Sequence, residues 1–462
     1  MSLLKHPLPY FADSAVLFAR LSHKPWAMFL DSGQPGSQYG RFDIIVADPF
    51  IKLCTIETVD SVQTEIITGG KKTISSEDPF SLLAKLMQPY RVPTNGYPFT
   101  GGAVGYFSYD LARQVEQLPE IACKSTIPHM QVGIYDWAVV VDHREKVSYL
   151  LSNGLHADTH AQWPALCAFF ENPAKAEQAQ DFKLTSPVAS NMDFEQYAYA
   201  FNTIKQYITE GDCYQVNLAQ RFAAKIQGHS WLAYQKLREI SPAPFMSFMN
   251  FGDLQVLSGS PERFLQVTGR HVETRPIKGT RPRANDVVLD KQYALELQNS
   301  SKDRAENLMI VDLLRNDISK NCEIGSVKAD TLFQLQSFAN VHHLVSFVTG
   351  KLQAGKTALD LLRGCFPGGS ITGAPKLRAM QIIEELERHR RGVYCGAIGY
   401  IGFDGNMDTN IAIRTAVCAE GEISFYAGGG IVADSELEKE YAETLDKASS
   451  MLKTMQYFQG SD

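Results

Sequence analysis

The sequence predicts an α+β protein built largely on antiparallel sheets, and two observations lead to this fold class. The first 160 residues contain short segments rich in aromatic and β-branched residues, bounded by Asp, Gly and Pro, which is typical of strands. The remainder mixes long hairpin-like segments with helical patterns, without the regular strand–helix alternation of a doubly wound fold. With 462 residues, 44% of them hydrophobic, the chain can bury a large core.

The N-terminal part is predicted to be rich in strands. Its clearest strand-like segments are residues 41–58, 101–111 and 134–143. Residues 171–192 lose this pattern and are polar, with many Ala, Gln and Ser residues. We therefore expect a linker at 171–192 that separates an N-terminal part, residues 1–170, from a C-terminal part, residues 193–462.

The C-terminal part is predicted to mix helices and strands. A helix should begin after Asp193, a typical N-terminal cap, and stop at Gly211. Further helical patterns occupy residues 230–241, 291–317, 374–390 and 435–454. Strands are expected at residues 217–227, as a pair at 245–269, and as a hairpin at 392–430. Long hairpins between helices favour antiparallel sheets.

Composition and charge exclude several classes of protein. The net charge of −7, with no basic stripe to offset it, argues against a nucleic-acid binder. No run approaches the roughly 18 apolar residues that cross a bilayer, and the first residues do not resemble a signal peptide. The eight cysteines are scattered singly, as in reduced cytosolic proteins. We expect a soluble cytoplasmic enzyme or binding protein, without a membrane or nucleic-acid partner.

Two helical patterns each carry a pair of acids three residues apart, Asp303 with Glu306 and Glu440 with Glu443. Residues at this spacing share one helix face, so each pair could aim its carboxylates at one point. Two such helices facing each other would suit magnesium, which prefers carboxylate oxygens. Lys302, Lys439 and Lys447 lie four residues from Glu306 or Glu443. Such pairs are typical of an ordinary solvated face, and spacing alone strongly favours that interpretation.

A basic loop at residues 273–283 holds Lys278 among Arg275, Arg281 and Arg283. A lysine crowded by cations can have a lowered pKa, and a neutral lysine is a nucleophile. The same cluster could instead bind a carboxylate or phosphate, or be a solvated basic loop. The residues alone favour the solvated loop.

Two other segments are open to two readings each. The glycine-rich segment at 365–380 could offer backbone N–H groups, including that of Thr372, to an anion at a helix start, or be a capped turn. His342 and His343 lie in an apolar stretch, where a buried core histidine is the simplest interpretation. From the residues alone, an anion-binding metalloenzyme is the sharpest hypothesis available.

Seven segments together are more specific, because they resemble the chorismate-utilising enzymes in sequence and in order. They are GDCYQVNLAQRF, SGSPERFL, TRPIKGTRPR, AENLMIVDLLRND, PGGSITGAPKLRAMQII, GAIGYIGFDGNMDTNIAIRT and AGGGIVADSELEKEYAETLDKA. The resemblance is strong over about residues 190–455 and weaker over 10–150. It implies one large duplicated α+β unit, with two orthogonally packed antiparallel sheets flanked by helices in four layers, α/β/β/α. Residues 193–462 would then form the chorismate-binding catalytic half, interlocked with the N-terminal half.

Within that family, the residue at position 278 indicates the branch. Members that make anthranilate have Ala there, whereas members that make 4-amino-4-deoxychorismate have Lys, as this chain does. The resemblance implies that Lys278 attacks carbon 2 of chorismate and expels the 4-hydroxyl, and that ammonia then enters at carbon 4. The product would supply p-aminobenzoate and folate biosynthesis. Anthranilate synthesis, isochorismate synthesis and a silent tryptophan-sensing subunit are the alternatives.

The resemblance also implies roles for individual side chains. Glu262 would be the general acid and base, and His343 would be the active-site histidine. The expected magnesium ligands are Glu306 and Glu443, with Asp303 and Glu440 as outer partners whose contact could be direct or through water. The expected substrate pocket contains Tyr394, Arg414, Gly429, Gly430, Thr280 and Thr372.

Two binding partners are expected besides chorismate. Nothing in the chain resembles the Cys–His–Glu triad of a glutamine amidotransferase, so ammonia from glutamine would come from a separate amidotransferase subunit. Relatives hold tryptophan in their N-terminal half, and the matching pocket residues here are Leu30, Ser32, Pro244, Phe245 and Met246. We therefore expect a tryptophan pocket, whether or not tryptophan occupies it.

Overall fold

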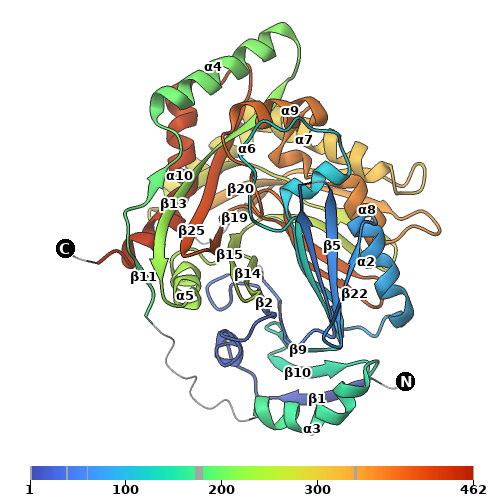
Figure 1. The fold of residues 1–462 in the computed structure, drawn as a ribbon. Coiled ribbons are helices and arrows are strands. Elements are labelled where there is room, and N and C mark those ends of the chain that lie inside the picture. Colours follow the sequence, from blue (N-terminus) through green and yellow to red (C-terminus); the bar gives the residue numbers. More distant parts are fainter. Residues whose placement is uncertain (1–2, 38–39, 60, 172–180, 338–340, 461–462) are drawn as a thin grey trace.

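The computed structural model describes residues 3–37, 40–59, 61–171, 181–337 and 341–460, which form two large antiparallel sheets with helices outside them (Figure 1). The strands of the first sheet follow the order β1 (Leu4–Leu8), β10 (Val147–Ser152), β9 (Trp137–Asp142), β3 (Phe42–Val46), β2 (Ala27–Asp31), β14 (Phe245–Asn250), β15 (Leu254–Ser260), β24 (Thr415–Ala419), β25 (Glu422–Ile431), β13 (Gln215–Gln227) and β11 (Lys183–Leu184). The short strands β12 (Ala189–Ser190) and β21 (Gly373–Ala374) also pair with β13.

The second sheet is built in the same way from strands far apart in the sequence. Its order is β18 (Ile277–Pro282), β20 (Val341–Lys351), β17 (His271–Thr274), β16 (Arg263–Thr268), β23 (Met407–Ile411), β22 (Ala397–Gly402), β7 (Gly102–Phe107), β8 (Met130–Tyr135), β4 (Ile51–Glu57), β5 (Val62–Thr68) and β6 (Lys71–Ser75). Strand β19 (Lys328–Ser337) pairs with β20. The α+β fold class predicted from the sequence is confirmed.

Both sheets contain strands from both parts of the chain. In the first sheet β2 pairs with β14, and in the second β7 pairs with β22. The hydrogen-bonded ladders therefore run without interruption across the predicted boundary. This interlocking is what the resemblance implied, since neither part could keep its sheets intact alone.

The apolar side chains divide into layers because successive residues of a strand point to opposite faces. In β2, Met28 joins the cluster between the two sheets, whereas Phe29 joins the cluster beneath the outer helices. In β7, Tyr106 faces the other sheet, while Phe107 packs on the opposite side. One cluster thus lies between the sheets and one lies on each outer face, which supports the expected four layers.

The helices cover the outer faces of the sheets, and in Figure 1 α10 lies beside β25 while α2 and α8 lie near β22. They are α1 (Ala15–Phe18), α2 (Pro79–Met87), α3 (Ala157–Glu171), α4 (Phe194–Glu210), α5 (Trp231–Ile240), α6 (Val287–Asn299), α7 (Ser301–Ser319), α8 (Ala358–Cys365), α9 (Lys376–Leu386) and α10 (Leu437–Tyr457), with short 3-10 turns at Gln88–Tyr90, Tyr109–Gln114 and Gly369–Ile371. Helix α4 has the predicted ends. Asp193 caps it through a reciprocal bond pair with Gln196, and Gly211 ends it in a left-handed conformation.

Three local predictions need correction. The helical pattern at 291–317 forms two helices, α6 and α7, because Ser300 leaves the helical conformation and its hydroxyl accepts a hydrogen bond from the Asp303 N–H. The predicted pair at 245–269 comprises three strands, β14 to β16, and the hairpin at 392–430 comprises four, β22 to β25.

The predicted linker is only partly visible. Within 171–192, residues 172–180 lie outside the described residues, while β11 and β12 add to the edge of β13. The later part of the predicted linker is therefore paired strand rather than free chain. Among the helices that the structure describes, none is long and apolar enough to cross a membrane.

Candidate active site

Lys278 lies on β18, at the edge of the second sheet, and three other predicted residues from separate parts of the chain act electrostatically on it. The lysine lies opposite Leu344 of β20, and Glu262 follows β15. Glu306 lies on α7 and Glu443 on α10. The charges of all three carboxylates act on the Lys278 ammonium, so the fold brings together residues that are far apart in the sequence.

Lys278 is half-buried, and its surroundings favour the neutral amine. Burial lowers its pKa because the ammonium loses water, and the charge of nearby Lys447 lowers it further. The carboxylates of Glu306, Glu262 and Glu443 only partly oppose this effect. Within the described part of the chain, the Lys278 amine has no hydrogen bond or salt bridge. A neutral amine of this kind can act as a nucleophile, because its lone pair is not protonated.

Glu262 has the opposite perturbation. Burial of its side chain raises its pKa to about 7, although the Lys278 charge and a 3.1 Å hydrogen bond from Ser370 Oγ to Glu262 Oε1 both oppose the rise. A carboxyl group with this pKa is partly protonated near neutral pH. It can therefore donate a proton to a leaving group and take one back, as a general acid and base must.

The four predicted metal-binding acids lie at the N-terminal ends of α7 and α10. Burial raises the pKa of Glu306, and the charges of Asp303 and Glu443 raise it further. Glu440 is buried and accepts a 2.6 Å hydrogen bond from Ser435. Burial and the Glu443 charge raise its pKa as well. The mutual repulsion of these carboxylates shows that several negative charges are concentrated at this end of the site.

Lysine and arginine side chains hold two of these acids. Lys447 Nζ lies 2.6 Å from Glu443 Oε1, and Arg281 Nη2 lies 3.3 Å from Asp303 Oδ2. Burial opposes ionisation of Glu443, but Lys447 and other lysines outweigh it and lower its pKa. Among the described residues, no three His, Cys, Asp or Glu side chains already form a compact metal-binding cluster.

The donor set nevertheless fits a magnesium ion. Magnesium takes carboxylate oxygens and keeps several waters, so it does not need a closed cage of protein ligands. Gly429 allows its backbone to approach the acids, because a Cβ there would lie 3.2 Å from Glu440 Oε2 and 3.5 Å from Glu443 Oε1. Glu306, Glu443 and Glu440 are thus the residues that could hold the ion.

His343 is fixed beside the lysine loop by its Nδ1 atom. This nitrogen lies 3.3 Å from the Gly279 carbonyl oxygen and 3.0 Å from Thr280 Oγ1. Because a carbonyl oxygen can only accept, Nδ1 carries the proton. Burial lowers the histidine pKa to about 4, and the charge of Arg414 contributes to the shift. The ring is therefore neutral at physiological pH.

Arg414 is a cation for which the described residues provide no counter-ion. Its side chain has no salt bridge or hydrogen bond within the described ranges, and burial lowers its pKa. Its backbone has a φ of 49°, a left-handed conformation that is uncommon for a residue with a side chain. A desolvated guanidinium beside neutral His343 is well suited to receive an anionic group.

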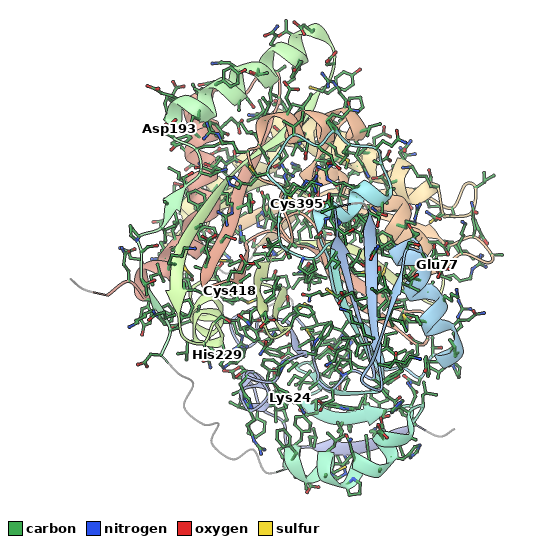
Figure 2. The ribbon with its side chains drawn as sticks, in the orientation of Figure 1. Lys24, Glu77, Asp193, His229, Cys395 and Cys418 are labelled. Atoms are coloured by element: carbon green, nitrogen blue, oxygen red, sulfur yellow. The ribbon has the colours of Figure 1, made fainter. Side chains whose placement is uncertain are left out.

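The remaining predicted pocket residues differ in their surroundings. Tyr394 is buried and stacks on Tyr426, with ring centres 5.3 Å apart. The next residue, Cys395, is labelled in Figure 2 near the centre of the molecule. Thr372 uses its hydroxyl and its N–H on the carbonyls of the preceding turn. Helix α9 begins only at Lys376, so Thr372 does not lie at a helix start.

Sequence reasoning missed two residues near the site. Lys447 appeared only as an ion-pair partner four residues from Glu443, but its charge also acts on Lys278 and its amine donates to the Gly428 carbonyl at 3.1 Å. Gln215 is buried, and neither polar atom of its side chain has a partner within the described residues. A Cβ at Gly430 would come within 2.6 Å of its Nε2. No local pattern in the sequence distinguishes Gln215.

A separate cavity of about 760 Å³ contains the predicted tryptophan-pocket residues. The pairing of β2 with β14 brings the segment around Asp31 to Met246. Ser32 Oγ is buried and has no partner within the described residues. The lining includes Leu30, Ser32, Pro244, Phe245 and Met246. All five predicted side chains thus surround one space large enough for an amino acid.

Comparisons with known proteins identify the family of the chain. The family model described as chorismate binding enzyme matches residues 36–453. The chain is 49% identical to aminodeoxychorismate synthase component 1 of Escherichia coli (strain K12), over 95% of each chain. It is 37% identical to anthranilate synthase component 1 of Aquifex aeolicus, over 95% of this chain and 91% of that one.

A solved structure gives the same result for the fold. The crystal structure of anthranilate synthase component I from Streptococcus pneumoniae superposes with a TM-score of 0.77 at 32% identity, over 90% of this chain and 92% of that chain. The family match covers the second sheet, the first sheet apart from β1 and β2, and every candidate site residue named above except those at positions 30 and 32. The chain therefore belongs to the family of chorismate-binding enzymes.

Proposed function

We propose that this chain is the chorismate-converting component of an aminodeoxychorismate synthase, which makes 4-amino-4-deoxychorismate from chorismate and ammonia. The observation that carries the proposal is the Lys278 amine, which has a lowered pKa and no ion pair within the described residues. The relatives at 46–49% identity bear the same name, which supports this branch of the family.

The first step uses Lys278 and Glu262. The neutral amine forms a bond to carbon 2 of chorismate, the ring double bond shifts, and the C4–O bond breaks. Glu262 donates its proton to the departing hydroxyl, which leaves as water. Its pKa of about 7 makes the protonated form available near neutral pH.

The second step reverses the first. Ammonia forms a bond to carbon 4, the double bond returns, and the bond between carbon 2 and the Lys278 nitrogen breaks. The Lys278 nitrogen became a positively charged ammonium when it attacked carbon 2, so it takes the electrons of the breaking bond and leaves as the neutral amine. The Glu262 carboxylate takes a proton from the new ammonium at carbon 4. Both residues are thereby restored to the states in which they began.

The acids at α7 and α10 would hold magnesium through Glu306 and Glu443, with Glu440 and Asp303 as outer partners. Bound there, the ion would neutralise and orient a carboxylate of the substrate. Arg414 would pair with a substrate carboxylate, assisted by Tyr394 and by the backbone of Gly430. Neutral His343, fixed by Gly279 and Thr280, would orient the ring.

The division of labour between the halves follows the same proposal. Residues 193–462 supply every side chain assigned to the reaction, whereas residues 1–170 supply Leu30 and Ser32 to the separate cavity. We assign tryptophan to that cavity, and ammonia from glutamine to a separate amidotransferase subunit. Addition of tryptophan to the protein in solution should raise its melting temperature. Ser32→Trp, whose side chain would fill the cavity, should abolish that rise.

Anthranilate synthase is the second candidate, since relatives of that name are 36–37% identical. Identification of the product separates the two. Purified chain incubated with chorismate, magnesium and ammonium should give 4-amino-4-deoxychorismate, which a lyase converts to p-aminobenzoate. Anthranilate as the main product would overturn the proposal. Glutamine should replace ammonium only when the amidotransferase subunit is added.

A further inference from the structure

A second polar cavity, of about 320 Å³, lies away from the acids and Lys278 of the candidate active site. It is bounded by the inner face of β13, β24 and β25 and by two loops, residues 123–127 and 389–394. Lys278, Glu262, Glu306 and Glu443 are not among its lining residues, and only Tyr394 is shared with the predicted substrate pocket. Its volume suits a small ligand.

The wall of this cavity is rich in cations. Arg221 and Lys225 lie on the same face of β13, and both pair with Glu422 of β25. The Arg391 guanidinium donates hydrogen bonds to Glu387 and to the backbone carbonyls of residues 371 and 217. Lys124 and Glu420 lie on exposed loops at the margin. Ion pairs therefore neutralise much of the charge on this wall, and Arg390 is itself paired with Glu57.

Among the described residues, Arg390 has a side-chain partner at only one of its three guanidinium nitrogens. Its side chain is 1% exposed, and Nη1 pairs with Glu57. Nε and Nη2, which form the other edge of the guanidinium, have no hydrogen-bond partner within the described residues. Leaving buried donors unpaired is costly, and this edge matches the two oxygens of a carboxylate or phosphate.

The neighbouring histidine reflects the same positive surroundings. His389, also on the wall, has a pKa lowered first by burial and then by the charges of Arg221 and Arg388. A neutral histidine next to several cations adds a hydrogen-bonding group without adding charge. The wall of the cavity therefore combines several cations with Arg390, whose Nε and Nη2 are buried without a partner among the described residues. The cavity has enough volume for a small anion.

We propose that this cavity binds a small oxyanion, a phosphate or carboxylate group held by Nε and Nη2 of Arg390, with Arg221 and Lys225 at its entrance. Neighbouring side chains cover the two nitrogen atoms, so the anion reaches them through a local shift of those side chains. The site is distinct from Arg414, which serves the chorismate pocket. Glu57 holds the guanidinium in place from its opposite edge.

Isothermal calorimetry on the full chain tests this site with inorganic phosphate and, separately, benzoate, at ionic strength matched with chloride. At least one anion should bind wild type and Arg414→Gln equally, and about tenfold more weakly to Arg390→Gln. Arg388→Gln is the matched control, because it removes an exposed arginine that does not line the cavity; it should retain binding. The anion that binds identifies the source as phosphate or carboxylate.

Three results would overturn the proposal. They are no binding of either anion at millimolar concentration, equal binding by Arg390→Gln, and loss of binding in Arg414→Gln alone, which would place the anion in the chorismate pocket. If Arg390→Gln does not fold by circular dichroism, the double variant Arg221→Gln and Lys225→Gln takes its place. Arg221 is half-buried and Lys225 is exposed; the double variant should weaken binding, and unchanged affinity in it would count against the site.

Discussion

Replacing Glu262 by Gln should make the protein more stable and less active at the same time. The carboxyl group is buried, and its pKa of about 7 compares with an ordinary 4.5. A carboxyl whose pKa is raised by folding is costly to ionise in the folded state. That cost appears as pH rises above 4.5 and is complete above 7.

The size of the effect follows from the shift. The difference between a pKa of about 7 and the ordinary 4.5 corresponds to about 3 kcal/mol, since each tenfold change in the ionisation constant is worth about 1.4 kcal/mol. The Gln side chain is nearly isosteric and cannot ionise. The free energy of unfolding of Glu262→Gln should therefore exceed that of wild type by about 3 kcal/mol near pH 8 and by little near pH 5.

Urea unfolding across this pH range, in the presence of a chelator, measures the difference directly. Turnover by the same variant should fall by about 10² to 10⁴, because the leaving hydroxyl loses its proton donor. Glu438→Gln, an exposed acid on α10, is the control and should change neither quantity. A stability difference independent of pH, or wild-type turnover in Glu262→Gln, would refute the reasoning.

Two further predictions concern the acids and the unpaired cation. Glu306→Gln and Glu443→Gln should each abolish turnover, because each removes a charged oxygen ligand for magnesium. The circular dichroism spectrum of each variant should stay unchanged. Full activity of either variant, or of wild type in excess chelator, would contradict the metal assignment. Arg414→Gln should raise the KM for chorismate by about 10- to 100-fold, because a hydrogen bond to a charged group contributes about 1.5–3 kcal/mol. An unchanged KM in steady-state assays would show that Arg414 does not bind the substrate.

Much of the fold could be predicted from local sequence. The ends of α4 follow from Asp193 and Gly211, whose chemistry is local. The break between α6 and α7 was missed because the prediction followed helical periodicity alone, although residues 298–304 contain no apolar side chain and Ser300 with Asp303 has the spacing of a helix start. A single hydrogen bond between Ser300 Oγ and the Asp303 N–H decides it.

The site could be predicted only through the family resemblance, because its properties are tertiary. The spacing of Glu440 and Glu443 does not reveal that the first is buried and the second half-exposed. The lack of a counter-ion for Arg414 and the action of Lys447 on Lys278 depend on the packing of distant elements. Local reasoning favoured a solvated face and a solvated loop, whereas packing gives a half-buried lysine among carboxylates.

Trapping the covalent intermediate tests the central claim most directly. Wild-type chain mixed with chorismate and magnesium but no ammonia, then quenched and digested, should show a chorismate-derived mass on the peptide that contains Lys278. Lys278→Ala should show no such mass and should lose most of its 4-amino product, whereas Lys356→Ala, which removes an exposed lysine, should behave as wild type. An absent adduct, together with 4-amino-4-deoxychorismate made by Lys278→Ala at the wild-type rate, would contradict covalent catalysis by this lysine.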